Sequence, residues 1–391
     1  MRPDVRRARI GTTIAFATNG ALPATLMARY AEVKDLLGIS DATFGLLVAG
    51  YALGAAGALN LPGVVLRRAG SRVTTTAGTV WIAVWLLVAA AGVVAGQVWL
   101  VVAALALAGW ADSIVDVAQN AQGLRVQAAR GSSVLNSMHA GWSVGAALGG
   151  AVGTLAATAG VPLPAHLAGW GLVCAASMAL AGRTFLADRP STSVRQAEPR
   201  SRVPWSAVRL LVPLGILALA GLSVEEVGNS WSAVLLATER GVPAASAGIG
   251  LSALLTAQFI GRALGDRFID RLGQRTALIW SLSGMVTGLL VTAWVPHPWV
   301  TVAGLALAGF ASAVTVPLAF ARADQVPGMR AHSGVTWIAL SMRVFAIVLS
   351  PAIGAMSSLS SLPVAITLVA MLSGAALILQ LPRRNGRDDR I

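Results

Sequence analysis

Five ionisable residues lie inside long apolar stretches of the sequence: Asp112, Asp116, Glu225, Glu226 and Arg343. A charged side chain in apolar surroundings is costly unless it meets water, a hydrogen-bond partner or an opposite charge. A carboxyl group in such a place can take up and release a proton, and a guanidinium group can bind a carboxylate or phosphate through two parallel hydrogen bonds. These five residues are therefore the first candidates for chemistry.

The stretch 98–124 carries a polar stripe. At about 100° per residue of a helix, Asp112, Asp116 and Gln119 fall within about 60° of one another, and Asn120 widens the same polar face. The other residues of this stretch are mostly Ala, Val, Leu and Ile. We interpret the stripe as a face that binds protons and a solute, with Asp112 nearest the middle. The alternative is a structural polar seam against neighbouring helices.

Glu225 and Glu226 are adjacent and point about 100° apart on a helix, with Asn229 between them in projection. One helix face cannot present both glutamates equally. We expect one of them to face a cavity and the other to meet a neighbouring helix. Repulsion between the two carboxylates favours a bound proton on one of them.

Arg343 permits two interpretations. It could pair with a carboxylate of the stretch around Glu225 or of the stretch around Asp112, in an ion pair that protonation or substrate breaks. Alternatively, it could bind an anionic substrate directly. The four carboxylates inside apolar stretches favour the ion pair.

Three further polar or aromatic residues are candidates for the same site. Asn19 lies near the middle of the first apolar stretch, with Pro23 one turn later. His139 belongs to the stretch 132–158, with Trp142 nearby. Histidine changes charge near physiological pH, but a structural role for His139 is equally compatible with its position towards one end.

The composition places the whole chain in a membrane. Of its 391 residues, 56% are hydrophobic and only 12% are charged, and the mean hydropathy is +0.72. Soluble proteins carry about 25% charged residues, and a helix that crosses the hydrocarbon core needs about 20 apolar residues. We expect an all-α membrane protein with twelve transmembrane helices, at 10–28, 42–66, 73–94, 98–124, 132–158, 166–187, 208–236, 244–269, 276–295, 299–321, 332–357 and 363–381.

The basic residues predict the orientation. Only Arg29, Lys34 and Arg240 among the 29 Lys and Arg residues fall in loops on one side, and Arg343 is in mid-helix. The others gather on the opposite side, which the positive-inside rule assigns to the cytoplasm. We expect a multi-pass protein of the cytoplasmic (inner) membrane with both termini cytoplasmic. The net charge of +13 then reflects topology, and we expect no nucleic-acid partner.

The chain contains an internal repeat. LALAGWA at 105–111 recurs as LALAGFA at 305–311, and the segment Ala58–Arg72 recurs 203 residues later as Gly261–Arg275. The long polar segment 188–206, rich in Pro, Ser and Arg, reads as a linker. We expect an N-terminal six-helix bundle over 1–187, a cytoplasmic linker over 188–206 and a C-terminal six-helix bundle over 207–391.

The segment GRALGDRFIDRLGQR, Gly261–Arg275, resembles the cytoplasmic loop between the second and third helices of a six-helix half in the major facilitator superfamily. In the first half, Pro62 and Gly63 stand where the second has Gly265 and Asp266, so the acidic residue is missing. The resemblance implies two pseudo-symmetric bundles that work by alternating access. DVAQNAQGLRVQ (116–127) and LNSMHAGWSVGAALGG (135–150) look like the fourth and fifth helices of fucose-permease-like members, which implies proton-coupled uptake of a small polar solute.

The same resemblance implies a gating role for the repeated loop. In this interpretation Asp266 ends the eighth span near the cytoplasm, with arginines around it, and the cluster bridges to the other half until the inside opens. The gating residues of this hypothesis are Gly261, Arg262, Gly265, Asp266, Arg267, Asp270, Arg271 and Arg275. Positive-inside topology alone would explain the arginines but not the acidic residues or the glycines.

The predicted function is secondary active transport, as proton-coupled symport of a small polar solute such as a sugar or an organic acid. The alternative is a proton-coupled efflux antiporter for drugs or metabolites. The chain has no G-x-x-x-x-G-K-[ST] nucleotide-binding motif, and Cys174 is its single cysteine. We therefore expect no enzyme activity, no metal and no cofactor, with protons as the coupling ion. The expected partners are the solute and the lipid bilayer, and the expected state is a monomer.

Overall fold

The structure is a computed structural model that describes residues 3–58, 61–131, 134–188, 205–327 and 333–381. Every regular element within these ranges is a helix. The first half consists of α1 (Pro3–Met27), α2 (Tyr30–Leu37), α3 (Asp41–Gly57), α4 (Leu61–Val94), α5 (Val98–Arg130), α6 (Leu135–Thr158) and α7 (Leu163–Gly182).

The second half begins with α8 (Trp205–Glu226), the π-helix η1 (Val227–Trp231) and α9 (Ser232–Arg240), which together form one span. It continues with α10 (Ile249–Leu272), α11 (Gln274–Trp294), α12 (Pro298–Ser312), α13 (Thr315–Ala323), α14 (Ser333–Leu359) and α15 (Leu362–Gln380). In the described ranges, nine helical stretches are long and apolar enough to cross a membrane. With α1, α3 and α10 they make up the twelve expected spans.

Three of the predicted spans are interrupted or irregular in the structure. The second predicted span, 42–66, is interrupted after α3 ends at Gly57, and α4 then runs on through the third span with a non-helical residue at Gly70. The seventh span contains the π-helix, and the tenth is broken into α12 and α13. Apolarity alone does not locate these breaks, because the apolar character continues across each of them.

The prediction of a cytoplasmic loop over Gly261–Arg275 is wrong. Helix α10 continues to Leu272, and Gly273 alone separates it from α11. Gly273 has φ 78° and ψ 153°, and Gly70, 203 residues earlier, has φ 75° and ψ 165°. L-residues with a side chain rarely adopt this backbone conformation. The repeat seen in the sequence is therefore also a repeat of backbone geometry, and its glycine forms the joint between two helices.

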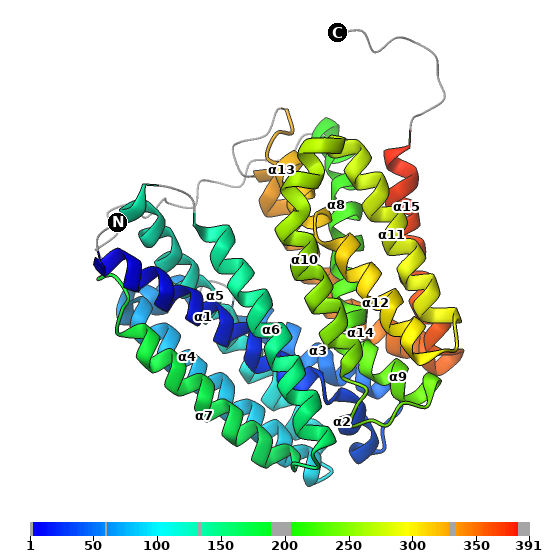
Figure 1. Cartoon of the computed structure of the whole chain (residues 1–391), viewed down its shortest axis with the longest axis horizontal. Coiled ribbons are helices and arrows are strands. Elements are labelled where there is room, and N and C mark those ends of the chain that lie inside the picture. The colour runs from blue at the N-terminus through cyan, green and yellow to red at the C-terminus, as the bar shows by residue number, and fades with distance from the viewer. Residues whose placement is uncertain (1–2, 59–60, 132–133, 189–204, 328–332, 382–391) are drawn as a thin grey trace.

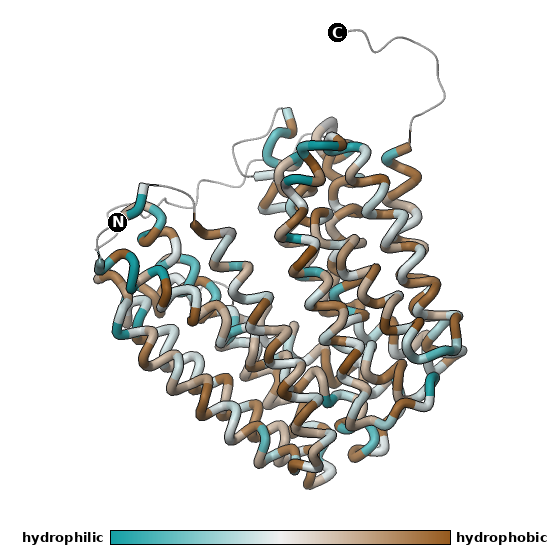
Figure 2. Tube along the Cα trace, viewed as in Figure 1, coloured by the Kyte–Doolittle hydropathy of each residue, from teal (hydrophilic) through white to brown (hydrophobic). Residues whose placement is uncertain are grey.

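The two halves lie side by side and meet mainly along two pairs of helices, α3 with α14 and α6 with α10. They diverge towards the end of the molecule that carries both termini and come together at the end that carries α2 and α9 (Figure 1). Hydrophilic segments are concentrated near these two ends, and the helices between them are mostly hydrophobic (Figure 2).

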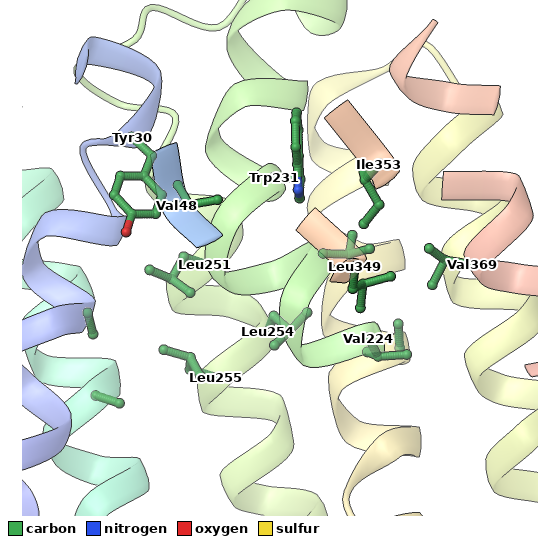
Figure 3. Close-up of a cluster of buried hydrophobic side chains, with 14 of the residues drawn as sticks. Tyr30, Val48, Val224, Trp231, Leu251, Leu254, Leu255, Leu349, Ile353 and Val369 are labelled. Atoms are coloured by element: carbon green, nitrogen blue, oxygen red, sulfur yellow. The ribbon is translucent and has the colours of Figure 1, made fainter. Parts of the chain in front are cut away.

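The end that carries α2 and α9 is held together by contacts between the halves. The backbone N–H of Ala42 donates to Ser358 Oγ at 2.9 Å, and Ser357 donates to the Asp41 carboxylate. The rings of Phe44 and Trp231 meet edge to face, with centroids 5.3 Å apart. Trp231 is fully buried and stands between Val48 of the first half and Leu349 and Ile353 of the second (Figure 3).

Candidate functional site

A hydrogen-bond network joins α1, α5 and α6 inside the first half. The amide of Asn19 donates to Asp112 Oδ1 at 2.6 Å. The Asn19 carbonyl oxygen accepts from Gln119 Nε2 at 3.3 Å and from the Trp142 indole N–H at 3.2 Å. Asn19 is only 4% exposed, so its side chain is held by these partners and fixes Asp112 in place.

The network continues along α5 towards the end that carries the termini. Gln119 Nε2 also lies 3.4 Å from Asp116 Oδ1, and Asn120 Nδ2 donates to the same oxygen at 3.0 Å. The Asn120 carbonyl oxygen lies 3.1 Å from His139 Nε2. Every residue predicted for the site in the first half thus belongs to one connected chain that runs from Asp112 to His139.

The local sequence explains why α6 packs closely enough against α1 to form the network. On α6, Gly145 and Gly149 face the backbone of α1, where a methyl group would meet the carbonyl oxygens of Ala17 and Ala21. Small residues at four-residue spacing allow such close helix packing. This contact brings Trp142 of α6 against Asn19 of α1. On α5, the i, i+4, i+7 spacing of the polar residues turns all of them towards the same neighbours.

The network opens onto a cavity between the two halves. The cavity has a volume of about 220 Å³, and Asp112, Ser113 and Asp116 of α5 form one wall. The opposite wall belongs to α14 and contains Arg343 and Ala346. Alanines of α3, at 52, 55 and 56, complete the lining. Asp116 and Arg343 are both exposed to this space, and Asp112 is half-buried.

Arg343 makes no hydrogen bond or ion pair with a described residue. It lines the cavity together with Asp116 and interacts with it electrostatically, but the two form no ion pair of 4.0 Å or less. The predicted pairing of Arg343 with a carboxylate is therefore not formed in this conformation. Its guanidinium group is left available to the cavity.

Of the four carboxylates predicted inside apolar stretches, Glu225 of α8 forms an ion pair with a described residue. Glu225 Oε1 accepts from Arg262 Nη2 at 2.8 Å and from Gln258 Nε2 at 2.7 Å. The side chains of Arg262 and Glu225 are 34% and 31% exposed. The sequence places Arg262 in a loop, but in the structure it lies on α10, which continues for ten residues beyond it.

Arg262 also links the halves. Its Nη1 donates to Ser143 Oγ of α6 at 3.0 Å. A guanidinium group offers five N–H donors in a rigid fork and can therefore hold a carboxylate and a hydroxyl at once. This hydrogen bond lies where α10 packs along α6.

The two glutamates of α8 lie in different surroundings, and neither is among the residues that line the cavity. Glu226 lies beside Ser230 and Ser350, and Tyr30 of the first half is near it. Asn229 lies within η1, is half-buried, and makes no hydrogen bond with a described residue. A π-helical turn adds a residue to one turn and is often found at functional sites. Here it follows directly after the two glutamates.

Comparison with known proteins shows the family. The model of the Major Facilitator Superfamily matches residues 10–224. An uncharacterized transporter of Sinorhizobium fredii is 30% identical over 380 residues, which cover 94% of this chain and 96% of the relative.

The chain belongs to the Major Facilitator Superfamily.

Solved structures agree in fold. A crystal structure of the nucleoside transporter NupG has a TM-score of 0.73 at 13% identity and covers 97% of this chain and 98% of its own. A crystal structure of a D-xylose-proton symporter has a TM-score of 0.72 at 13% identity, with 96% and 97% covered. At these identities the likeness concerns the fold alone. The family and its members are transporters, so the chain is a transporter and not an enzyme.

The residues predicted from the superfamily's loop motif lie on α10 and the start of α11. A methyl group on Gly261 would meet Phe310 and Ala313, and one on Gly265 would meet Val314, so both glycines allow α10 to pack against the tenth span. Arg267, Asp270 and Arg271 are exposed, and Arg275 donates to the Gln380 carbonyl of α15. The Asp266 side chain lies outside the described residues. The gating role stays a prediction.

The first-half motif has Gly63 in place of the acidic residue Asp266, and a carboxylate from elsewhere in the chain lies near this motif. Asp188, after α7, accepts from the backbone N–H of Ser71 at 2.9 Å and from its hydroxyl at 2.9 Å. It also forms an ion pair with Arg125 of α5. This carboxylate caps the helical segment that starts after Gly70. The loop comparison could not find Asp188, because it lies more than a hundred residues away in sequence.

Sequence reasoning missed Tyr51 and Gln258 near the site and assigned Arg262 to gating alone. The Tyr51 hydroxyl lies next to Asp112 without reaching hydrogen-bond geometry. Gln258 and Arg262 are one helical turn apart and both reach Glu225. The i, i+4 spacing of Gln258 and Arg262 at the end of an apolar run could have indicated a shared polar partner. The charged residues that follow favoured the interpretation as a loop instead.

Proposed function

We propose that this superfamily member is a proton-coupled symporter of a small polar solute that works by alternating access. One observation carries the proposal: the connected network from Asp112 through Asn19, Gln119, Asp116 and Asn120 to His139, which borders a cavity between the halves.

The two aspartates suit proton binding. Asp112 and Asp116 are one helical turn apart on α5, where side chains are neighbours. Two ionised carboxylates at this spacing repel each other in surroundings of low dielectric constant, and a proton on one removes the repulsion. We assign the transported proton to Asp112, because it is half-buried and held by Asn19, whereas Asp116 is exposed to the cavity.

Side-chain amides do not relay protons, so in this proposal the amides of the network position the titratable groups. Asn120 and His139 lead from Asp116 towards the end that carries the termini. Histidine can accept and donate a proton near physiological pH. In this proposal His139 exchanges protons with the solution on that side, and no cofactor other than the proton takes part.

The cavity favours a small solute over a drug. Its volume of about 220 Å³ is below the ~300–1,000 Å³ of sites for drug-sized ligands. Three ionisable side chains from the two halves line it, beside Ser113 and four alanines, and they offer partners to a polar solute. Symport therefore fits better than efflux of bulky compounds. The D-xylose-proton symporter named above combines this fold with proton coupling and a small polar solute.

We further propose that the protein resides in the inner membrane with both termini in the cytoplasm, as the distribution of arginines predicts. The structure then corresponds to an inward-facing state, because the halves meet at the end that carries α2 and α9 and diverge at the other (Figure 1). We expect the transporter to act as a monomer.

Proteoliposomes with an internal pH-sensitive dye test the proposal. Small sugars, organic acids and amino acids are added outside one class at a time, without an imposed gradient. A symporter acidifies the lumen when its solute enters, whereas an antiporter makes it more alkaline. If no class of solute moves protons in either direction, proton coupling is refuted.

A further inference from the structure

We infer that the solute of this cavity is a zwitterion, a small molecule that carries one positive and one negative group, held between Asp116 of α5 and Arg343 of α14. This inference rests on the proposed function, since it concerns the solute-binding side of the same cavity. The two charges stand on opposite walls and belong to different halves of the transporter.

Arg343 supplies the site for the negative group. Its guanidinium group has no ion pair or hydrogen bond within the described part of the chain, and it lines the cavity. A guanidinium group binds a planar carboxylate through two hydrogen bonds. When the cavity closes around the solute and excludes water, an unpaired charge becomes costly. The substrate is the natural partner for Arg343 in that state.

Asp116 supplies the site for the positive group. Gln119 and Asn120 approach its Oδ1 atom, and none of the described hydrogen bonds involves Oδ2. The carboxylate is exposed to the cavity. An ammonium or quaternary ammonium group at this wall would pair with Asp116, while the proton on Asp112 keeps the neighbouring carboxyl group neutral.

The other charged residues near the cavity are either paired with each other or lie in different surroundings. Arg262 and Glu225 neutralise each other at 2.8 Å. Glu226 lies in a different environment, beside Ser230 and Ser350. The charges left for recognition are therefore one negative and one positive, on facing walls.

Other substrate classes match this arrangement less well. A neutral sugar would leave both Asp116 and Arg343 without a charged partner once water is excluded. A simple anion would satisfy Arg343 but would lie against the Asp116 carboxylate, and a simple cation would have the converse problem. Removing one partner from a buried charge pair is far more costly than leaving the pair intact. A zwitterion satisfies both walls at once.

The binding test uses the purified full-length protein and matched probes. The standard amino acids and small betaines are screened by thermal shift. The best zwitterion is then compared with two analogues of the same skeleton, an amine without the carboxylate and an acid without the amine. We expect each analogue to bind at least about tenfold more weakly. Neutral polyols are expected to produce no shift.

Two variants test which charged group of the solute binds Arg343 and which binds Asp116. Arg343→Gln should abolish the preference for the zwitterion over the amine analogue, and Asp116→Asn should abolish the preference over the acid analogue. Each variant should keep the other preference. Arg209→Gln, an exposed position on α8, is the matched control and should keep both preferences.

The inference is overturned if a neutral sugar or a simple anion stabilises the wild-type protein and no zwitterion does. Equal weakening of all ligands by both variants would also contradict it. Proton movement driven by that sugar or anion in proteoliposomes would leave the proposed function intact, so the two failures are distinguishable.

Discussion

Arg262 of α10 and Glu225 of α8 form an ion pair of 2.8 Å, and the same guanidinium group reaches Ser143 in the other half of the transporter. An apparent surface arginine of a cytoplasmic motif thus belongs to the interface between the halves. Arg262 therefore binds a carboxylate of its own half and a hydroxyl of the other half at the same time.

Neutralising either partner of this pair should impair transport. Hydrogen bonds to charged groups contribute ~1.5–3 kcal/mol, so Arg262→Gln and Glu225→Gln should each lower the uptake rate about tenfold or more. The double variant should lose less than the product of the two single effects, because the pair acts as a unit. Uptake into proteoliposomes measures this, and Arg209→Gln, at an exposed position of the same helix as Glu225, serves as the control. Additive losses would show that the two residues act separately.

The glycine joints should differ in their tolerance of a methyl group. Gly70→Ala and Gly273→Ala both force an L-residue into backbone strained by ~1–3 kcal/mol. At Gly70 the new methyl group would also collide with the Asp188 carboxylate, whereas nothing lies near Gly273. We expect the thermal unfolding temperature of the purified protein to fall for both variants, and further for Gly70→Ala.

Gly57→Ala is the control for the joints, because a methyl group there meets nothing within 4 Å and the residue ends α3 in helical conformation. This variant should leave the unfolding temperature nearly unchanged. An equal tolerance of alanine at Gly70 and Gly57 would contradict the assignment of Gly70 as a strained joint.

Enlarging Gly45 should shift the conformational equilibrium. A methyl group on Gly45 would lie 2.5 Å from the Ser350 carbonyl oxygen of α14, so Gly45→Val obstructs the contact between α3 and α14 that closes one end. We expect spin labels at Asp35→Cys and Glu239→Cys, placed in a Cys174→Ala background, to move apart in this variant. Gly57→Val on the same helix should leave their distance distribution unchanged.

Much of this site was predictable from the polar stripe on α5. The i, i+4, i+7 spacing of Asp112, Asp116 and Gln119 identified the network wall, and the rarity of polar residues in apolar stretches added Asn19. Family resemblance supplied the fold. The connections themselves needed the structure, since the hydrogen bond from Trp142 to Asn19 joins residues 123 positions apart.

The conformation of the charged segment around Arg262 was the least predictable property. Arg262 precedes other arginines in the sequence, and the run was interpreted as a loop, although α10 continues through it to Leu272. The π-helix after Glu226 and the cap that Asp188 provides for Ser71 were equally hidden. Each depends on how separate helices pack, which neither hydropathy nor periodicity within one helix reports.

The hydrogen bond between Asn19 and Asp112 should be required for coupling. Asn19→Ala removes the donor at 2.6 Å and leaves Asp112 in altered surroundings. We expect fewer protons per solute transported, with solute exchange retained. Thr13→Ala, which removes a hydroxyl bonded only to its own helix, is the control and should keep the ratio. An unchanged ratio in Asn19→Ala would show that the network is structural.

The most direct test of the central claim is proton movement in proteoliposomes that contain Asp112→Asn. The account predicts that solute added outside no longer acidifies the lumen, while exchange of labelled for unlabelled solute across the membrane continues. Solute-driven acidification at the wild-type ratio in this variant would contradict the assignment of the proton to Asp112.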